Sequence, residues 1–300
     1  MVFRTALAPL LWGTTYLVTT EFLPPSPLWI AALRALPAGL LLLAVRPGVP
    51  GRAWAGRLLV LGTLNIGAFF ALLFIAATRL PGGVAATLGA TQVVVVLGLA
   101  ALLLGERITA RSAAVAAAGV TGVALLVLRG ATALDPVGVL AGLGTSVSLG
   151  LGLVLTRRWG APTSADGTAL PALTATAWQL LGGSALLLPL AVITEGAPPS
   201  LDWASLAGFV WLTGVGTALA YVLWFAGLRA LPATQVSLLG LASPVTAALV
   251  GWVALGESLT PGQLAGAALV LASVVIGQRK PSTPDGSREV HRFRTPQRVV

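Results

Sequence analysis

Residues 74–109 read FIAATRLPGGVAATLGATQVVVVLGLAALLLGERIT, and residues 225–260 read FAGLRALPATQVSLLGLASPVTAALVGWVALGESLT. The two stretches align without a gap at a shift of 151 positions. The shift superimposes their rare residues, pairing Leu80-Pro81 with Leu231-Pro232, Gly105-Glu106 with Gly256-Glu257, and Thr109 with Thr260. Matches at rare residue types are hard to obtain by chance in an Ala- and Leu-rich sequence, so the chain contains an internal repeat.

The composition around the repeat is that of a membrane protein. Of the 300 residues, 56% are hydrophobic and 9% are charged, whereas an ordinary soluble domain carries about 25% charged residues. The apolar runs are roughly 20 residues long, which is the length of a helix that crosses a bilayer. Their boundaries predict ten helices, at residues 4–22, 27–45, 57–78, 81–104, 109–128, 135–156, 171–193, 203–228, 232–255 and 260–277.

Five predicted helices fall in each repeat. Because five is an odd number, the second copy must enter the membrane from the opposite side. The sequence therefore predicts an all-α polytopic membrane protein of ten transmembrane helices, arranged as two inverted five-helix repeats around a central cavity. We expect residues 1–130 to form the first repeat, 131–278 the second, and 279–300 a disordered basic cytoplasmic tail. Folds with this symmetry bind a substrate near the midplane, so we expect transport by alternating access.

The net charge of +9 indicates orientation rather than a nucleic-acid partner. Short loops rich in Lys and Arg stay in the cytoplasm. If the N-terminus is cytoplasmic, only Arg79 and Arg129 fall on the far side, and the near side holds Arg4, Arg46, Arg52, Arg57, Arg107, Arg111, Arg157, Arg158 and Arg229. We therefore expect a multi-pass protein of the cell inner membrane, with both termini cytoplasmic, that functions as a monomer in the lipid bilayer.

The sequence lacks the residues that several kinds of chemistry require. The chain has no Cys, and its one His is His291 in the tail, so we expect no disulfide, no metal site and no haem. It has no Gly-rich phosphate loop and no cluster of acidic residues for a magnesium-dependent transferase. We expect a transporter rather than an enzyme, with no cofactor and no direct use of ATP.

Short motifs along the chain resemble the EamA-type members of the drug/metabolite transporter superfamily. They are Trp12-Gly13-Thr14-Thr15-Tyr16, Ala32-Leu33-Arg34-Ala35-Leu36, Ser243-Pro244 and the segment from Leu255 to Thr260. The resemblance covers the ten helices and implies two inverted halves around a central cavity. It also implies a small-molecule substrate, drawn from amino acids, other metabolites and drugs. The segment from Trp12 to Pro25 is similar to the branch that exports aromatic amino acids.

Arg34 is the one charge that lies well inside a predicted helix. A charged side chain at this depth costs about 3 kcal/mol or more, so it must face the protein interior. Two roles are open to it: it binds a substrate carboxylate through two hydrogen bonds, or it anchors the carbonyls of a broken helix. Gln179 occupies the corresponding place in the second repeat.

Aromatic and polar side chains share helix faces at spacings of three and four residues, as in Trp12, Thr15, Tyr16 and Thr19. Such a face suits a cavity wall that stacks on a flat ring, although aromatic stripes also serve packing. Interhelical hydrogen bonds would likewise explain the deep amides and hydroxyls without a ligand. The candidate substrate-binding residues are Trp12, Tyr16, Arg34, Asn65, Gln92, Trp178, Gln179, Tyr221 and Ser243.

Other positions have structural interpretations. Trp29, Trp203 and Trp252 lie near helix ends and are expected to face the membrane interface. Pro244 lies inside a predicted helix, which it should kink while freeing a backbone carbonyl.

The positions of the acidic residues indicate whether transport is coupled to protons. A proton-coupled exporter needs a carboxylate or His buried at mid-depth, but every Asp and Glu falls at a helix end, in a loop or in the tail. We therefore expect export of amino acids, most of all aromatic ones and related amphiphiles, by facilitated diffusion. The alternative is a proton-coupled exporter of drugs or of other metabolites such as threonine.

Overall fold

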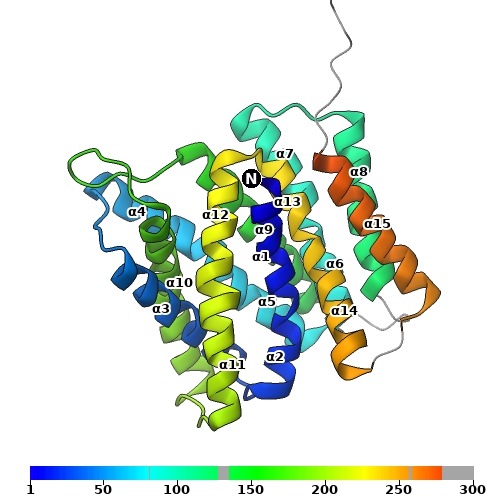
Figure 1. The fold of residues 1–300 in the computed structure, drawn as a ribbon, viewed down its shortest axis with the longest axis horizontal. Coiled ribbons are helices and arrows are strands. Elements are labelled where there is room, and N and C mark those ends of the chain that lie inside the picture. Colours follow the sequence, from blue (N-terminus) through cyan, green and yellow to red (C-terminus); the bar gives the residue numbers. More distant parts are fainter. Residues whose placement is uncertain (81, 128–134, 257–258, 279–300) are drawn as a thin grey trace, which may run out of the picture.

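The computed structural model describes the chain except residues 81, 128–134, 257–258 and 279–300, and except the side chains of residues 16, 77, 78 and 82–84. The described part is helical, apart from loops and one isolated β-bridge between Thr163 and Ala169 (Figure 1). Within it, nine helices are long and apolar enough to cross a membrane. The fold is therefore the predicted all-α polytopic one. The expected tail, together with Arg129 and Glu257, lies outside the described residues.

The helical elements follow the predicted runs closely. The first five runs contain α1 (Val2–Gly13) and α2 (Thr15–Phe22), α3 (Pro27–Val45), α4 (Arg52–Gly62) with η1 (Thr63–Gly67) and α5 (Ala68–Arg79), α6 (Gly82–Ala90) and α7 (Gln92–Leu104), and α8 (Ala110–Val127). The second five contain α9 (Pro136–Trp159), α10 (Ala172–Glu195), α11 (Trp203–Thr213) with η2 (Gly214–Leu219) and α12 (Ala220–Ala230), α13 (Ala233–Gly240) and α14 (Ala242–Leu255), and α15 (Pro261–Gln278).

Several runs predicted as single helices are interrupted. The first breaks at Thr14, whose hydroxyl donates to the carbonyl of Leu11 over 2.7 Å. Thr91 separates α6 from α7, and its hydroxyl donates to the carbonyl of Leu88 over 2.6 Å. Leu241 separates α13 from α14, so this helix is interrupted three residues before Pro244, the residue at which the sequence predicts a kink.

Backbone irregularities recur at the shift of the sequence repeat. The π-helical segments η1 and η2 begin at Thr63 and Gly214, which are 151 positions apart. Gly105 and Gly256 end α7 and α14 with φ of 69° and 67°, a left-handed conformation that glycine adopts without a steric penalty. The two copies therefore share their bends and turns as well as their sequence.

One pair of helices, α3 and α10, joins the two repeats through hydrogen bonds at both ends. The indole of Trp29 in α3 donates to the carbonyl of Gly196 over 3.2 Å, and that of Trp178 in α10 donates to the carbonyl of Gly48 over 2.9 Å. Trp29 is only 5% exposed, so the expectation that it faces the membrane interface is wrong. Its ring instead satisfies a carbonyl beyond the end of the partner helix.

The other two tryptophans assigned to the interface are exposed, Trp203 at 85% and Trp252 at 53%.

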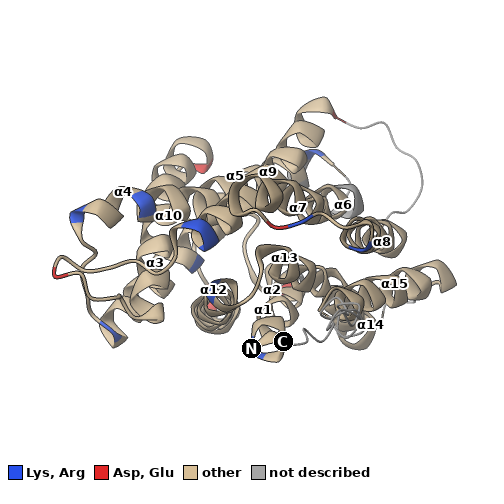
Figure 2. Ribbon diagram, turned by 90° about the horizontal axis from the view of Figure 1, so that it is seen from above, with Lys and Arg blue, Asp and Glu red and all other residues tan. Residues whose placement is uncertain are grey.

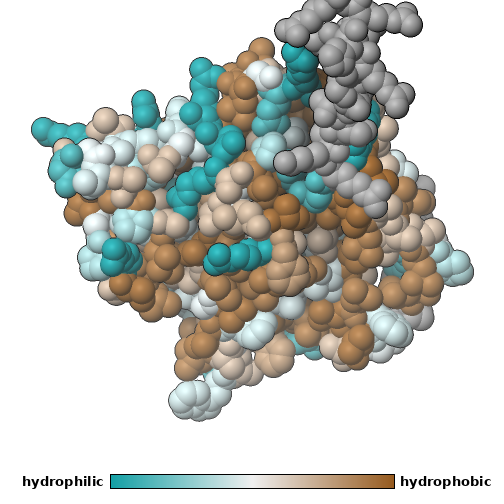
Figure 3. Space-filling view, turned by 45° about the horizontal axis from the view of Figure 1, so that its top comes forward, coloured by the Kyte–Doolittle hydropathy of each residue, from teal (hydrophilic) through white to brown (hydrophobic). Residues whose placement is uncertain are grey.

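Arginines cluster at the end of the molecule that carries the N-terminus (Figure 2). The side chains of Arg157, Arg158 and Arg111 donate to the carbonyls of Arg229, Leu103 and Ile276, which lie at the C-terminal ends of α12, α7 and α15. These carbonyls lack intrahelical partners and carry partial negative charge. Hydrophilic side chains gather at this end and hydrophobic ones cover much of the surface below it (Figure 3).

Candidate functional site

A cavity of about 290 Å³ lies between helices of both repeats. Its lining combines aromatic rings with a few polar groups, as expected of a small-molecule site. The lining includes Trp12, Thr15, Arg34, Asn65, Phe69, Phe70, Gln92, Thr145, Tyr221, Trp224, Phe225, Ser237, Gly240, Ser243 and Pro244. Six of the nine predicted residues are thus brought together: Trp12, Arg34, Asn65, Gln92, Tyr221 and Ser243.

Arg34 projects from α3 onto the π-helical segment η2. Its Nε donates to Oγ1 of Thr217 over 2.9 Å, and its Nη2 donates to the carbonyl oxygen of Gly216 over 3.1 Å. The guanidinium carbon lies 5.0 Å from the centroid of the Phe70 ring, within the range of a cation–π interaction. With 4% of its surface exposed, Arg34 is held in one orientation.

The anchoring bonds leave donor capacity on Arg34. A guanidinium carries five N–H groups, and no acceptor among the described residues takes a hydrogen bond from Nη1. The same side chain lines the cavity. Arg34 therefore serves the structural role considered from its sequence and still has an N–H group to offer to a ligand.

Two further polar groups meet beside Arg34. The indole Nε1 of Trp12 donates to the same Gly216 carbonyl over 3.0 Å. The hydroxyl of Thr15, which also lines the cavity, is buried without a hydrogen-bond partner among the described residues. Leaving such a group unpaired costs about 1–3 kcal/mol. This part of the cavity is thus ready to form additional hydrogen bonds.

The first repeat has a neutral counterpart of this arrangement. Asn65 lies in η1, and its Nδ2 donates to Oε1 of Gln179 in α10 over 2.9 Å and to Oγ1 of Thr156 over 3.2 Å. Gln179 is buried behind Asn65, and the described cavity lining includes Asn65 alone of the two. Gln179 therefore positions Asn65 as Thr217 positions Arg34.

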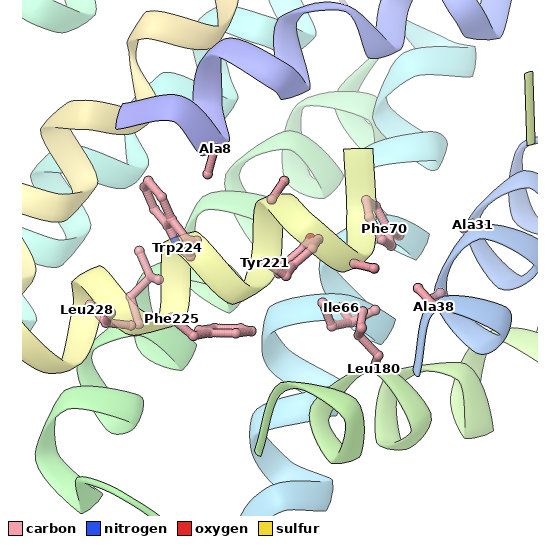
Figure 4. Close-up of a cluster of buried hydrophobic side chains, with 14 of the residues drawn as sticks. Ala8, Ala31, Ala38, Ile66, Phe70, Leu180, Tyr221, Trp224, Phe225 and Leu228 are labelled. Carbon is pink, nitrogen blue, oxygen red and sulfur yellow. The ribbon is translucent and has the colours of Figure 1, made fainter. Parts of the chain in front are cut away.

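An aromatic wall flanks the polar groups. The ring centroid of Trp12 lies 5.2 Å from that of Tyr221 and 5.1 Å from that of Trp224, and Tyr221 lies 5.6 Å from Phe225. The side chains of Tyr221, Trp224 and Phe225 all project from α12 (Figure 4). Tilted rings at these separations stabilise one another, which keeps the wall in a fixed shape.

Gln92 and Ser243 are 151 positions apart and both line the cavity. Each lies one or two residues after the break in its helix. The repeat therefore places one polar side chain from each copy at equivalent bends beside the cavity.

The other predicted residues lie elsewhere. Trp178 bonds to the carbonyl of Gly48 at the end of α3 and is outside the described lining. Tyr16 belongs to α2, but its side chain lies outside the described part of the chain. Phe70, Thr145 and Gly240 line the cavity without having been predicted. For Gly240, the sequence did contain a signal, because Pro244 lies four residues later and cannot donate a helical hydrogen bond to its carbonyl.

The described lining contains no Asp, Glu or His. Several acidic side chains instead bind helix N-termini. Glu195 accepts from the backbone N–H groups of Leu28 and Trp29 over 2.8 and 3.0 Å, and Glu106 accepts from that of Ala233 over 3.1 Å. The backbone N–H of Ser205 donates to Asp202 and lowers the pKa of this carboxyl.

Known proteins resemble most of the chain. The profile of the EamA-like transporter family matches residues 1–128 and 136–277. The protein PecM of Dickeya dadantii is 42% identical over 272 residues, which cover 90% of both chains. A probable amino-acid metabolite efflux pump of Salmonella typhimurium is 27% identical, covering 91% of this chain and 93% of the relative.

A solved crystal structure that is 21% identical superimposes with a TM-score of 0.78, covering 92% of this chain and 96% of the other; this similarity concerns the fold. The family match and the similarity to PecM extend over the helices that enclose the cavity. The chain therefore belongs to the EamA-like transporter family.

Proposed function

We propose that this transporter exports amino acids across the cell inner membrane, most of all aromatic amino acids and related amphiphiles. The observation that carries the proposal is the position of Arg34, a buried cation with an N–H group to spare, in a cavity walled by Trp12 and Tyr221. The guanidinium would bind the carboxylate, and the rings would stack on the side chain of the substrate. The relative described as a probable amino-acid metabolite efflux pump supports the same class of substrate.

Arg34 is suited to the carboxylate because its other bonds fix the orientation of the guanidinium. Because Nε and Nη2 already bond to Thr217 and Gly216, the guanidinium keeps one orientation, and Nη1 does not have to be positioned when the substrate binds. A site that is organised before the substrate arrives loses less entropy on binding. The unpaired hydroxyl of Thr15 would add a second donor to the same carboxylate.

The proposed mechanism is alternating access by uniport. Residues 1–130 and 131–278 would form the two inverted repeats, whose relative motion exposes the cavity to one side and then to the other. The arginine-rich end would face the cytoplasm, with both termini on that side, and one chain would suffice for transport. The absence of an acidic residue from the described lining supports net movement down the substrate gradient without a proton.

Counterflow into proteoliposomes tests the substrate class. Purified protein is reconstituted with unlabelled substrate inside, and uptake of labelled Trp, Thr, Lys and an organic cation is followed. We expect exchange of Trp to exceed that of the other three. Exchange of the organic cation without exchange of Trp would contradict the proposal.

The same vesicles test the energetics. An imposed pH gradient should leave the final Trp distribution at equilibrium. Accumulation of Trp above equilibrium, driven by the gradient, would replace uniport by proton coupling.

A further inference from the structure

We propose that a second cavity, at the arginine-rich end of the molecule, is the vestibule through which substrate reaches the central cavity, and that Glu106 latches the gate between the two cavities. This inference rests on the proposed alternating access and deepens it, because it names the gate on one side of the membrane. It does not depend on which small molecule is carried.

The vestibule measures about 270 Å³ and lies where the ends of α7, α8, α13 and α15 meet. The residues of its lining that matter here are Val93, Leu97, Glu106, Thr234 and Leu238. On α7 the lining runs from Val93 to the turn that follows Leu104, which is about three helical turns. The vestibule therefore extends well into the bundle.

The vestibule and the central cavity share a wall. Val93 of α7 lines both of them. On α13, Thr234 and Leu238 line the vestibule, whereas Ser237 and Gly240 line the central cavity. The same two helices thus lead from one cavity to the other, and the side chains between them decide whether the cavities connect.

The wall between the cavities is apolar. Val93, Leu238 and Leu241 are 3%, 6% and 4% exposed and belong to one buried hydrophobic cluster. α7 and α13 pack side by side in both ribbon views (Figures 1 and 2). Contacts between apolar side chains are not directional, so they can part and form again without leaving a polar side chain unpaired. We call these three side chains the gate.

Glu106 bonds across the line of the gate. Its Oε1 accepts from the backbone N–H of Ala233 over 3.1 Å, and its Oε2 accepts from Oγ1 of Thr234 over 2.8 Å. Ala233 is the first residue of α13, where backbone N–H groups lack intrahelical partners and carry partial positive charge. Glu106 belongs to the first repeat and α13 to the second, so this carboxylate ties the two repeats together at the rim of the vestibule.

The two sides of this latch differ in how they are held. Gly105 turns the chain with a φ of 69°, and the backbone N–H of Glu106 donates to the carbonyl of Ala100 over 3.2 Å, which fixes the position of Glu106 on α7. On the other side, α13 is a short helix between Pro232 and the interruption at Leu241. A short helix with a break at each end can swing as a unit.

Alternating access requires that bonds between the repeats break at the end that opens. Glu106 is partly exposed, so its carboxylate can exchange the two bonds to α13 for bonds to water. The latch is therefore reversible, and loss of the charge should favour the open gate.

A single thiol in the central cavity tests the gate, because the chain contains no Cys. Ser237→Cys supplies this thiol, and a membrane-impermeant methanethiosulfonate is added to either face of membrane vesicles. The face at which Ala165→Cys reacts marks the arginine-rich end. In the Ser237→Cys protein, Glu106→Gln should raise the rate of reaction from this face roughly tenfold, the factor expected for bonds to a charged group, and should not raise the rate from the opposite face. An unchanged rate overturns the latch.

Glu195→Gln is the matched control. Glu195 also binds a helix N-terminus through two hydrogen bonds, of 2.8 and 3.0 Å to Leu28 and Trp29, but it joins α10 to α3 at the other end of the bundle. It should leave the rate from the arginine-rich face unchanged. An equal rise in both variants would reflect general loosening and would overturn the proposal.

Thr234→Val provides a second variant in case Glu106→Gln does not fold. It keeps the charge of Glu106 and removes one of its two bonds, so the reaction rate should rise roughly threefold. No rise would contradict the latch.

Locking the gate tests its role in transport. The double variant Glu106→Cys/Thr234→Cys is joined by a short bifunctional methanethiosulfonate, which should stop counterflow until a reductant restores it. Glu106→Cys alone, treated in the same way, is the control. Full transport by the cross-linked protein would overturn the gate. Thiol labelling needs no substrate, so a failure to exchange amino acids would contradict the proposed function and leave the gate to be judged by the labelling rates.

Discussion

Nδ2 of Asn65 donates a hydrogen bond to Oε1 of Gln179 over 2.9 Å, and this bond joins the π-helical segment of the first repeat to a helix of the second. The equivalent bond, from a helix of the first repeat to the π-helical segment of the second, joins Nε of Arg34 to Oγ1 of Thr217 over 2.9 Å. One connection is neutral and the other is charged. The pseudo-symmetric cavity therefore has a single cationic group in its described lining, which gives a bound substrate a preferred orientation.

The bond between Asn65 and Gln179 should contribute to stability. Asn65→Ala removes the donor and leaves the buried Oε1 of Gln179 unpaired, at an expected cost of about 1–3 kcal/mol in the free energy of unfolding. The double variant Asn65→Ala/Gln179→Ala should be less destabilised than the sum of the single variants, with a coupling of about 0.6 kcal/mol. Unfolding by SDS, followed by circular dichroism, measures both quantities. Additive effects would show that the two side chains do not interact.

Arg34 should govern the recognition of the carboxylate. Arg34→Gln removes the charge, so counterflow of Trp should fall by roughly a factor of 10 or more, whereas any exchange of tryptamine, the analogue of Trp that has no carboxylate, should not fall. Arg34→Lys keeps the charge but cannot reproduce the fork that holds Thr217 and Gly216, and should give an intermediate rate. A fall that is the same for Trp and tryptamine would assign Arg34 to structure alone.

The aromatic wall should bind the side chain of the substrate. Tyr221→Ala and Trp12→Ala remove rings that face each other across 5.2 Å, and each should weaken transport of Phe and Trp by roughly fivefold while leaving the protein folded. Trp203→Ala is the control, because Trp203 is 85% exposed. Unchanged transport in both wall variants would assign these rings to packing.

Close contact between helices should make one glycine irreplaceable. A Cβ on Gly62 in α4 would overlap the carbonyl oxygen of Gln179, whereas a Cβ on Gly56 in the same helix meets nothing within 4 Å. We expect Gly62→Ala to cost about 1–3 kcal/mol of stability through overpacking and Gly56→Ala to be neutral or slightly stabilising. Thermal unfolding in detergent compares the two variants. Similar melting temperatures would show that the close contact between α4 and α10 at Gly62 does not determine stability.

The proposed orientation can be tested directly because the chain contains no Cys. Ala165 and Ser200 are exposed in loops at the two ends of the bundle. In intact cells, a membrane-impermeant maleimide should label Ser200→Cys but not Ala165→Cys, and it should label both after lysis. The reverse pattern would place the termini outside the cell.

Much of the fold could be predicted because apolar length and helix boundaries are written in the sequence. α3 occupies the predicted range 27–45, with Pro27 at its start. The interruption at Thr14 and the π-helical segments were not predicted, because a change in backbone hydrogen bonding over one turn leaves the hydropathy unchanged. Pro244 was the exception, since a missing N–H can be read from the residue type alone.

The cavity was predicted in part for a related reason. Burial of a polar group at mid-depth is costly, so Arg34 and Asn65 stand out in an apolar run. Helical spacing indicates which residues share a face but not which neighbour that face meets. Trp29 and Trp178 illustrate this limit, because their indoles bond to carbonyls beyond the ends of neighbouring helices. Phe70 has no sequence signal, since it becomes informative only when Arg34 lies over its ring.

The paired π-helical segments bear on the ancestry of the chain. π-helical turns are rare and strain the regular hydrogen-bond pattern of a helix, yet η1 and η2 begin 151 positions apart in the two copies. A costly irregularity that lies in the same register of both copies is most simply explained by descent of the two copies from one unit. We infer that the unit from which both copies descend already contained this turn; two such units, inserted in opposite directions, would have assembled a cavity as a symmetric dimer. The difference between Arg34 and Gln179 is then a later specialisation, open to a fused chain because each half can mutate alone.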